Sequence, residues 1–242
     1  MKILNTTCNN NMHEECKLVK GRQVKDLVYV VKEHVTPYTY ATLRQNKNVR
    51  LVPCVYKKGY YHMEMVKGYL FFKVVKPIRV IQLQLRRGSE WETVMVDDPM
   101  HWLGMKELAE LAKPGRVLVA GLGMGLILHH LVKRKDDIRQ IVVVEIDSDV
   151  ISLIGKYYIP KDERIKIVND DFFNFIRYNK DRNFDTVILD LWTISEDDDL
   201  VKRKTVLHSM VTAYRLCQVL YPHAKVLVWG MRSARTGKNY EL

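Results

Sequence analysis

The chain has 242 residues, of which 47% are hydrophobic, and a formal net charge of +11. This size and composition accommodate one large domain, or one domain with a smaller module, and exclude disordered and fibrous proteins. No apolar run approaches the roughly 18 residues of a membrane helix, and the N-terminus lacks a signal-peptide pattern, so we expect a cytoplasmic protein without membrane contact.

The excess positive charge lies entirely in the N-terminal part. Residues 1–90 contain 17 Lys and Arg against 6 Asp and Glu, whereas residues 91–242 contain 22 of each. The asymmetry favours a polyanionic partner such as nucleic acid for residues 1–90; the alternative is a soluble surface with lysines on exposed strand edges. The four cysteines are too few for a disulfide framework and fit no zinc-binding spacing, so we expect no metal.

The first predicted elements in chain order are strands. Residues 1–24 are polar and predict a loose leader, and residues 25–98 predict a basic antiparallel β module. Enrichment in β-branched and aromatic residues, with period-two alternation in several segments, is typical of strands. The predicted strands are 27–31, 49–56, 60–66, 69–75, 79–85 and 91–96.

From residue 99 to the end, predicted helices and strands alternate. Near-continuous apolar strands between amphipathic helices indicate an α/β fold with a Rossmann-like parallel sheet covered on both faces. The helices are predicted at 101–112, 124–134, 148–158, 171–178 and 199–220, and the strands at 116–120, 141–145, 164–169, 185–190 and 225–230.

A glycine-rich turn follows the first strand of this domain. Ligands of such sheets bind at the carboxyl ends of the strands. Gly121, Gly123 and Gly125 lie there, where glycines permit a tight turn and close approach of a ligand to the backbone. Because residue 126 is Leu, the spacing departs from the dinucleotide fingerprint G-x-G-x-x-G, and a nicotinamide cofactor is less favoured.

Acidic residues follow the next two strands. Glu145 ends its strand 20 residues after Gly125 and can accept hydrogen bonds from both hydroxyls of a ribose. Asp170 can accept the exocyclic amine of an adenine, with Phe172 packed nearby; the alternative for Asp170 is to cap the helix 171–178. These positions predict a nucleoside-binding edge.

Two further candidates lie at the end of the strand 185–190. Asp190 can orient or deprotonate an incoming nucleophile, or simply cap the following loop. Trp192 can stack on a substrate. His101, on the helix 101–112, is another candidate for the site and is equally expected at the surface.

Four segments carry a resemblance to a known superfamily. VLVAGLGMG, VVVEIDSDVI, IVNDDFFNFI and FDTVILDLW resemble the successive motifs of class I S-adenosylmethionine-binding enzymes, and are most similar to those of spermidine synthases. The resemblance implies a sheet of order 3-2-1-4-5 and a nucleoside bound by the glycine turn and the acids named above. The residues after Gly230 are too few for the C-terminal antiparallel hairpin of full class I domains, so N-terminal strands or the second subunit of a homodimer would cover the sheet edge.

Methyl transfer from S-adenosylmethionine is the leading functional hypothesis. The sulfonium is already activated, so the protein needs only to align the reactants and exclude water. The alternative is aminopropyl transfer from decarboxylated S-adenosylmethionine, which the N-terminal β module favours. The loop after the strand 185–190 counts against this alternative, because it keeps only the first acid of the spermidine synthase loop, Asp190. A third hypothesis is a non-catalytic protein that binds nucleosides or nucleic acid.

Overall fold

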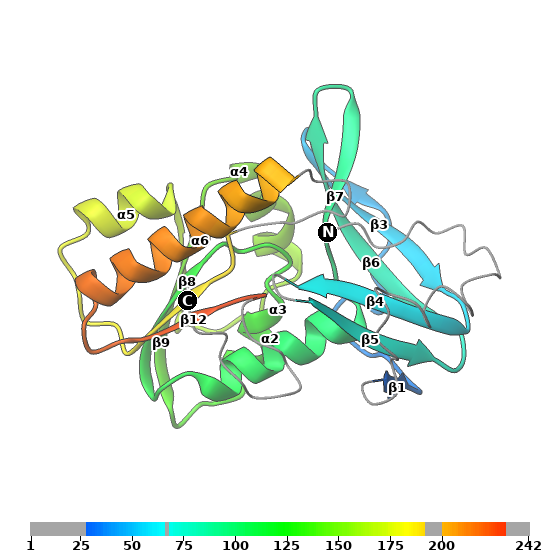
Figure 1. The fold of residues 1–242 in the computed structure, drawn as a ribbon, viewed down its shortest axis with the longest axis horizontal. Helices are drawn as coiled ribbons and strands as arrows, with labels where there is room; N and C mark the ends of the chain where they lie inside the picture. Colours follow the sequence, from blue (N-terminus) through cyan, green and yellow to red (C-terminus); the bar gives the residue numbers. More distant parts are fainter. Residues whose placement is uncertain (1–27, 66–67, 192–199, 231–242) are drawn as a thin grey trace.

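The computed structural model describes residues 28–65, 68–191 and 200–230 (Figure 1). The predicted leader 1–24, Trp192 and all residues after Gly230 lie outside this described part. Within the three ranges, no helix has the length and apolar character that crossing a bilayer requires.

A five-stranded parallel sheet forms the C-terminal part, as predicted. Its spatial order is β10-β9-β8-β11-β12, which is 3-2-1-4-5 when the strands are numbered within this part, and every neighbouring pair is parallel. The strands are β8 (Gly115–Ala120), β9 (Ile138–Glu145), β10 (Ile165–Asn169), β11 (Thr186–Leu189) and β12 (Lys225–Val228). The predicted lack of a C-terminal hairpin concerns residues outside the described part.

Helices cover both faces of this sheet (Figure 1). Side chains alternate along β8, so Val117 and Val119 pack with α2, α3, α4 and η1, whereas Leu118 and Ala120 pack with α5 and α6. Both faces are therefore apolar, which explains the continuous apolar runs of the strands. The helices are α2 (Pro99–Leu111), α3 (Leu126–Leu131), α4 (Ser148–Val150), η1 (Ile151–Gly155), α5 (Phe172–Tyr178) and α6 (Leu200–Leu220).

Two helices differ from their predicted extent. The helix predicted at 124–134 begins only at Leu126, because Gly125 has a φ of 63° and lies in the left-handed region. The helix predicted at 148–158 is one short α-helical turn, capped by Asp147, that continues as the π-helical segment η1.

The N-terminal part contains the antiparallel sheet that the sequence predicts, but its strands are divided between two sheets. One sheet is antiparallel with order β2-β3-β6-β7, and the other has order β1-β5-β4 with β1 parallel to β5. Lys76 and Pro77 separate β5 from β6, and β6 pairs with β3 instead of β5. The strands are β1 (Val28–Val31), β2 (Arg44–Gln45), β3 (Val49–Tyr56), β4 (Gly59–Met65), β5 (Gly68–Val74), β6 (Ile78–Arg87) and β7 (Glu90–Val96).

The antiparallel sheet shares a hydrophobic core with the Rossmann-like part. Leu51, Leu83 and Met95 belong to the same buried cluster as Met105 of α2 and Leu128 of α3. The two parts therefore pack together without an intervening solvated layer, and the boundary at residues 98–99 stays a prediction from sequence.

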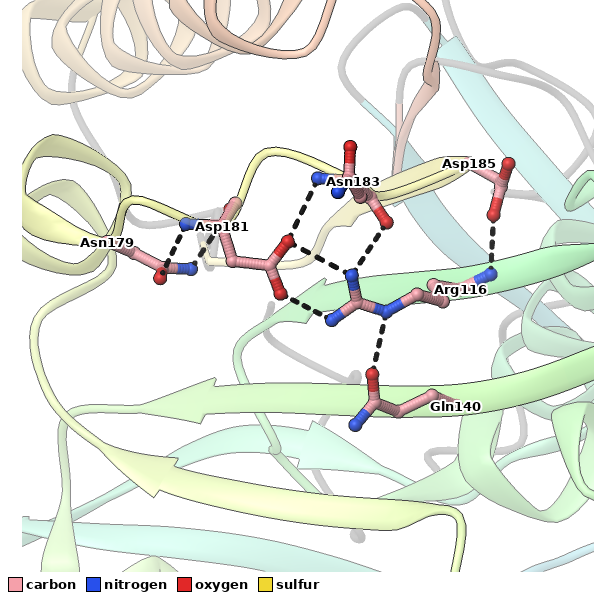
Figure 2. A network of polar contacts seen from close by, with 6 residues as sticks. All are labelled: Arg116, Gln140, Asn179, Asp181, Asn183 and Asp185. Carbon is pink, nitrogen blue, oxygen red and sulfur yellow. Dashed lines mark hydrogen bonds and ion pairs between the residues drawn. The ribbon is translucent and has the colours of Figure 1, made fainter.

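Arg116 organises a polar network at the amino end of the parallel sheet (Figure 2). Its guanidinium binds both carboxylate oxygens of Asp181, at 3.0 and 2.6 Å, and also the Gln140 side chain at 2.7 Å and the Asn183 carbonyl at 3.0 Å. The hydrogen bonds from Arg116 hold the pKa of Asp181 below its usual range. The network lies at the opposite end of the strands from the candidate site.

Replacing Arg116 with Met should lower the free energy of unfolding by about 1 kcal/mol, because the pair is partly exposed and solvent screens it. A carboxyl with a depressed folded pKa stabilises the fold above its unfolded pKa, and this contribution is lost as the pH falls through the folded pKa. The difference between the two proteins should therefore shrink in acid during chemical denaturation. Arg139→Met is the matched control, since the Arg139 side chain is 76% exposed and its guanidinium lies 4.0 Å from the Asp185 carboxylate. An equal effect of both substitutions would contradict the prediction.

Candidate active site

The carboxyl ends of four neighbouring strands bring the predicted residues to one edge of the sheet. Gly121, Glu145, Asp170 and Asp190 follow or end β8, β9, β10 and β11. Backbone hydrogen bonds link them across the sheet: the Gly121 N–H donates to the Val144 carbonyl at 2.8 Å, and the Asp170 N–H to the Glu145 carbonyl at 3.1 Å. The parallel register therefore aligns a glycine turn and three acids.

The glycines of the turn are required by packing within the chain. Gly121 has a φ of 90°, and a Cβ there would lie 2.2 Å from the Asp190 carbonyl oxygen. Gly123 has a φ of 48°, and its Cβ would lie 2.9 Å from the Met95 sulfur. Contacts of the protein itself thus explain these two residues, and their contact with a nucleoside stays a prediction.

Glu145 ties the glycine turn to the start of α4. The residue is only 8% exposed, and its two carboxylate oxygens accept the Leu122 and Asp147 backbone N–H groups, each at 2.8 Å. Each carboxylate oxygen has a second lone pair, so ribose hydroxyls can still bind there. The sequence does not predict the bond to Leu122, because it joins residues 23 positions apart.

The structure separates two alternative roles at the end of β10. Asp171 caps α5, since its side chain accepts the Asn174 N–H at 2.9 Å. The Asp170 carboxylate accepts only the adjacent Asp171 N–H among the described bonds, at 2.8 Å, and is partly exposed at the edge. Phe172 is 3% exposed and belongs to the hydrophobic core, so its contact with an adenine stays a prediction. Of the two acids, Asp170 is the better candidate for binding the adenine amine, because Asp171 caps the helix.

Asp190 has an altered acidity. Burial, with a further contribution from Glu145, raises the pKa of Asp190 to about 6, and His101 opposes this shift. No residue of the described part donates a hydrogen bond to its carboxylate. A carboxylate of this pKa, held at the edge of the sheet where the sequence predicts a ligand, is suited to accept a proton near neutral pH.

His101 is buried beside Asp190. The surface position, which the sequence leaves equally open, is not observed. His101 is 2% exposed, its Nδ1 lies 3.4 Å from the Asp98 carboxylate, and its ring centroid lies 5.1 Å from that of Trp229. Burial follows from tight packing of α2 on β12: a Cβ at Gly104 would lie 2.2 Å from the Trp229 ring. The helical pattern alone does not reveal this second contact face.

Several basic side chains of the β module are engaged by neighbours. The Arg50 guanidinium stacks on Trp91 at 4.3 Å and bonds Gln84 at 2.7 Å, and the Arg79 guanidinium binds backbone carbonyls. Such contacts fit an ordinary solvated sheet face as well as a polyanion-binding one. Nucleic-acid binding through residues 1–90 therefore stays a prediction.

The family model and the curated relatives that match this chain carry the names of one kind of enzyme. Residues 100–214 match the model of the spermine/spermidine synthase domain. The chain is 30% identical to polyamine aminopropyltransferase 2 of Caldanaerobacter subterraneus over 52% of this chain and 41% of that protein, and 24% identical to polyamine aminopropyltransferase 1 of Aquifex aeolicus over 69% and 56%. It thus spans about half the length of the curated relatives it matches. The solved spermidine synthase of Thermotoga maritima is similar with 20% identity and a TM-score of 0.36, over 54% of this chain and 53% of that one.

These matches correct the ranking of the two transfer reactions that the sequence predicts. The sequence predicts methyl transfer ahead of aminopropyl transfer because the amine loop after Asp190 is not kept, and this prediction is wrong. The domain model and the curated relatives carry the names of aminopropyltransferases. The departure of a few residues after Asp190 does not outweigh the match over residues 100–214. Residues 100–214 are thus similar to a spermine/spermidine synthase domain, and this match includes the whole edge that carries Glu145, Asp170 and Asp190.

Proposed function

We propose that this chain transfers an aminopropyl group from decarboxylated S-adenosylmethionine to an amine. The observation that carries the proposal is the domain match over residues 100–214, which runs from α2 into α6. It includes the glycine turn, all three edge acids and His101.

The donor set at the edge fits this nucleoside. Ribose hydroxyls and the adenine amine are hydrogen-bond donors, and Glu145 and Asp170 supply acceptors. The aminopropyl group and the amine acceptor are cationic, and Asp190 supplies a negative charge for them. The turn 121–125 and the residues directly after β9, β10 and β11 include no Lys or Arg to pair with the carboxylate that S-adenosylmethionine would bring. This composition favours the decarboxylated form.

The chemistry asks the protein for alignment and for one proton acceptor. The bound sulfonium supplies the leaving group: the amine lone pair forms a bond to the methylene carbon next to sulfur, and the carbon–sulfur bond breaks with its electrons passing to sulfur, which leaves a neutral thioether nucleoside. Asp190 accepts a proton from the attacking amine, and the electrostatic effect of His101 favours its ionised form. Glu145 and Asp170 hold the nucleoside so that the methylene faces the amine.

The test incubates the purified full chain with decarboxylated S-adenosylmethionine and, separately, with S-adenosylmethionine, each with 1,4-diaminobutane, 1,3-diaminopropane or spermidine. We expect methylthioadenosine and an amine longer by one aminopropyl unit, from the decarboxylated form alone, by chromatography and mass spectrometry. Methylated amine from S-adenosylmethionine, or no product from any pair, would contradict the proposal.

A further inference from the structure

The N-terminal β module holds Met124, in the glycine-rich turn 121–125, through both of its backbone polar groups. Met124 is fully buried, and both of its backbone polar groups bind residues that precede α2. The Tyr38 hydroxyl donates to the Met124 carbonyl at 2.5 Å, and the Met124 N–H donates to the Met95 sulfur at 3.3 Å. These partners lie 86 and 29 positions earlier in the chain.

Tyr38 is itself fixed on several sides. Residues 36–39 form a β-turn with Pro37 at its second position, in which the Thr39 N–H donates to the Thr36 carbonyl at 3.1 Å. The Thr36 hydroxyl accepts the Tyr38 N–H and donates to the Asp97 carboxylate. The Tyr38 ring stacks on Tyr158 with centroids 4.5 Å apart. The position of the hydroxyl is therefore determined by the β module and by the segment after η1.

The ionisation of Tyr38 agrees with a donor role. Burial, and then the nearby Asp97 carboxylate, raise the pKa of Tyr38 well above its usual value. This shift favours the protonated hydroxyl, which can donate a hydrogen bond. Its single proton is directed to the Met124 carbonyl.

The same turn is held from its other side by Glu145, which accepts the Leu122 N–H. We infer that Tyr38 and Met95 are positioning residues, which keep the turn 121–125 in the conformation that presents Glu145 and the turn to the nucleoside. The identity of the nucleoside rests on the proposed function, whereas the effect on the turn does not.

Tyr38→Phe removes the hydroxyl and leaves the Met124 carbonyl unpaired, and Met95→Leu keeps a similar volume but removes the sulfur acceptor. The matched control is Tyr221→Phe, because Tyr221 is 1% exposed and its hydroxyl also has one described partner, Arg182 at 3.2 Å. In hydrogen exchange of the unliganded proteins, we expect amides of residues 121–126 to exchange about tenfold faster in the first two variants and at an unchanged rate in the control.

A second readout is calorimetric affinity for methylthioadenosine. It should fall about tenfold in Tyr38→Phe and stay unchanged in Tyr221→Phe. Faster exchange of the turn in Tyr38→Phe and Met95→Leu, with the control unchanged, supports the inference whether or not the wild type binds the nucleoside. Failure of the wild type to bind methylthioadenosine would instead count against the proposed function. Unchanged exchange in both variants overturns the inference, as does equal acceleration in all three proteins, which would show a loss of global stability alone.

Discussion

Asp190→Asn should lower the rate of aminopropyl transfer by a factor of about 10² to 10⁴, the range that a positioned proton acceptor contributes. Asparagine has nearly the same shape and cannot take the proton of the attacking amine. The affinity for methylthioadenosine should change little, because Glu145 and Asp170 are the residues proposed to hold the nucleoside. Initial rates at saturating cosubstrates and calorimetric titration of the same preparations separate the two quantities.

The pH dependence gives an independent check on Asp190. Burial raises its pKa to about 6, and the carboxylate is the active form, so the rate should fall as the pH decreases through about 6. Protonation of the free amine also lowers the rate in acid, but its effect is common to wild type and variant. We therefore expect the inflection near pH 6 in the wild type and its absence in Asp190→Asn. The same inflection in both proteins would assign it to another group and remove Asp190 from the proton transfer.

The control for loss of charge is Asp185→Asn, at the other end of the same strand. The Asp185 carboxylate accepts the Arg116 N–H at 2.7 Å and takes part in the network of Figure 2, far from the candidate site. This substitution should affect unfolding and leave the transfer rate close to that of the wild type. A similar loss of rate in Asp185→Asn and Asp190→Asn would indicate that both act through the stability of the sheet.

The parallel sheet is predictable because the patterns that specify each strand and helix lie within short stretches of the sequence. Strands such as β8 are apolar on both faces, and the intervening helices make each connection a crossover, which fixes a parallel arrangement. The acids at the strand ends are predictable for the same reason: Glu145 and Asp170 directly end or follow a recognisable strand. Residues at the ends of strands can therefore be located from the sequence without knowledge of tertiary contacts.

The remaining features depend on contacts between distant segments. The parallel pairing of β1 with β5 joins Val28 to Phe71, and nothing in either strand specifies its partner. His101 is buried because α2 packs on β12 through Gly104 and Trp229, which a helical pattern cannot show. The bond from Tyr38 to Met124 likewise crosses from the β module to the turn. The sequence therefore predicts the edge itself, but not the groups that hold it in place.

Glu145→Gln should weaken binding of methylthioadenosine by about 100-fold, because the carboxylate has two kinds of partner. It accepts the Leu122 and Asp147 N–H groups, and the proposed function adds the ribose hydroxyls. Glutamine has one acceptor oxygen and one amino group, so one of the two buried N–H groups would face a donor, at a cost of about 1–3 kcal/mol. The loss of a ribose bond adds to this.

A double-mutant cycle with a modified ligand separates the two contributions. If Glu145 binds the ribose, removing the 2′-hydroxyl from methylthioadenosine should weaken binding to the wild type about tenfold and weaken binding to Glu145→Gln much less. If Glu145 acts only by holding Leu122, the deoxy ligand should lose the same factor with both proteins, and the ribose role would be wrong. Calorimetry at one pH and salt concentration supplies all four affinities. Coupling between the Glu145 side chain and a single hydroxyl would locate the ribose at the end of β9, which β8 and its glycine turn separate from Asp190 at the end of β11.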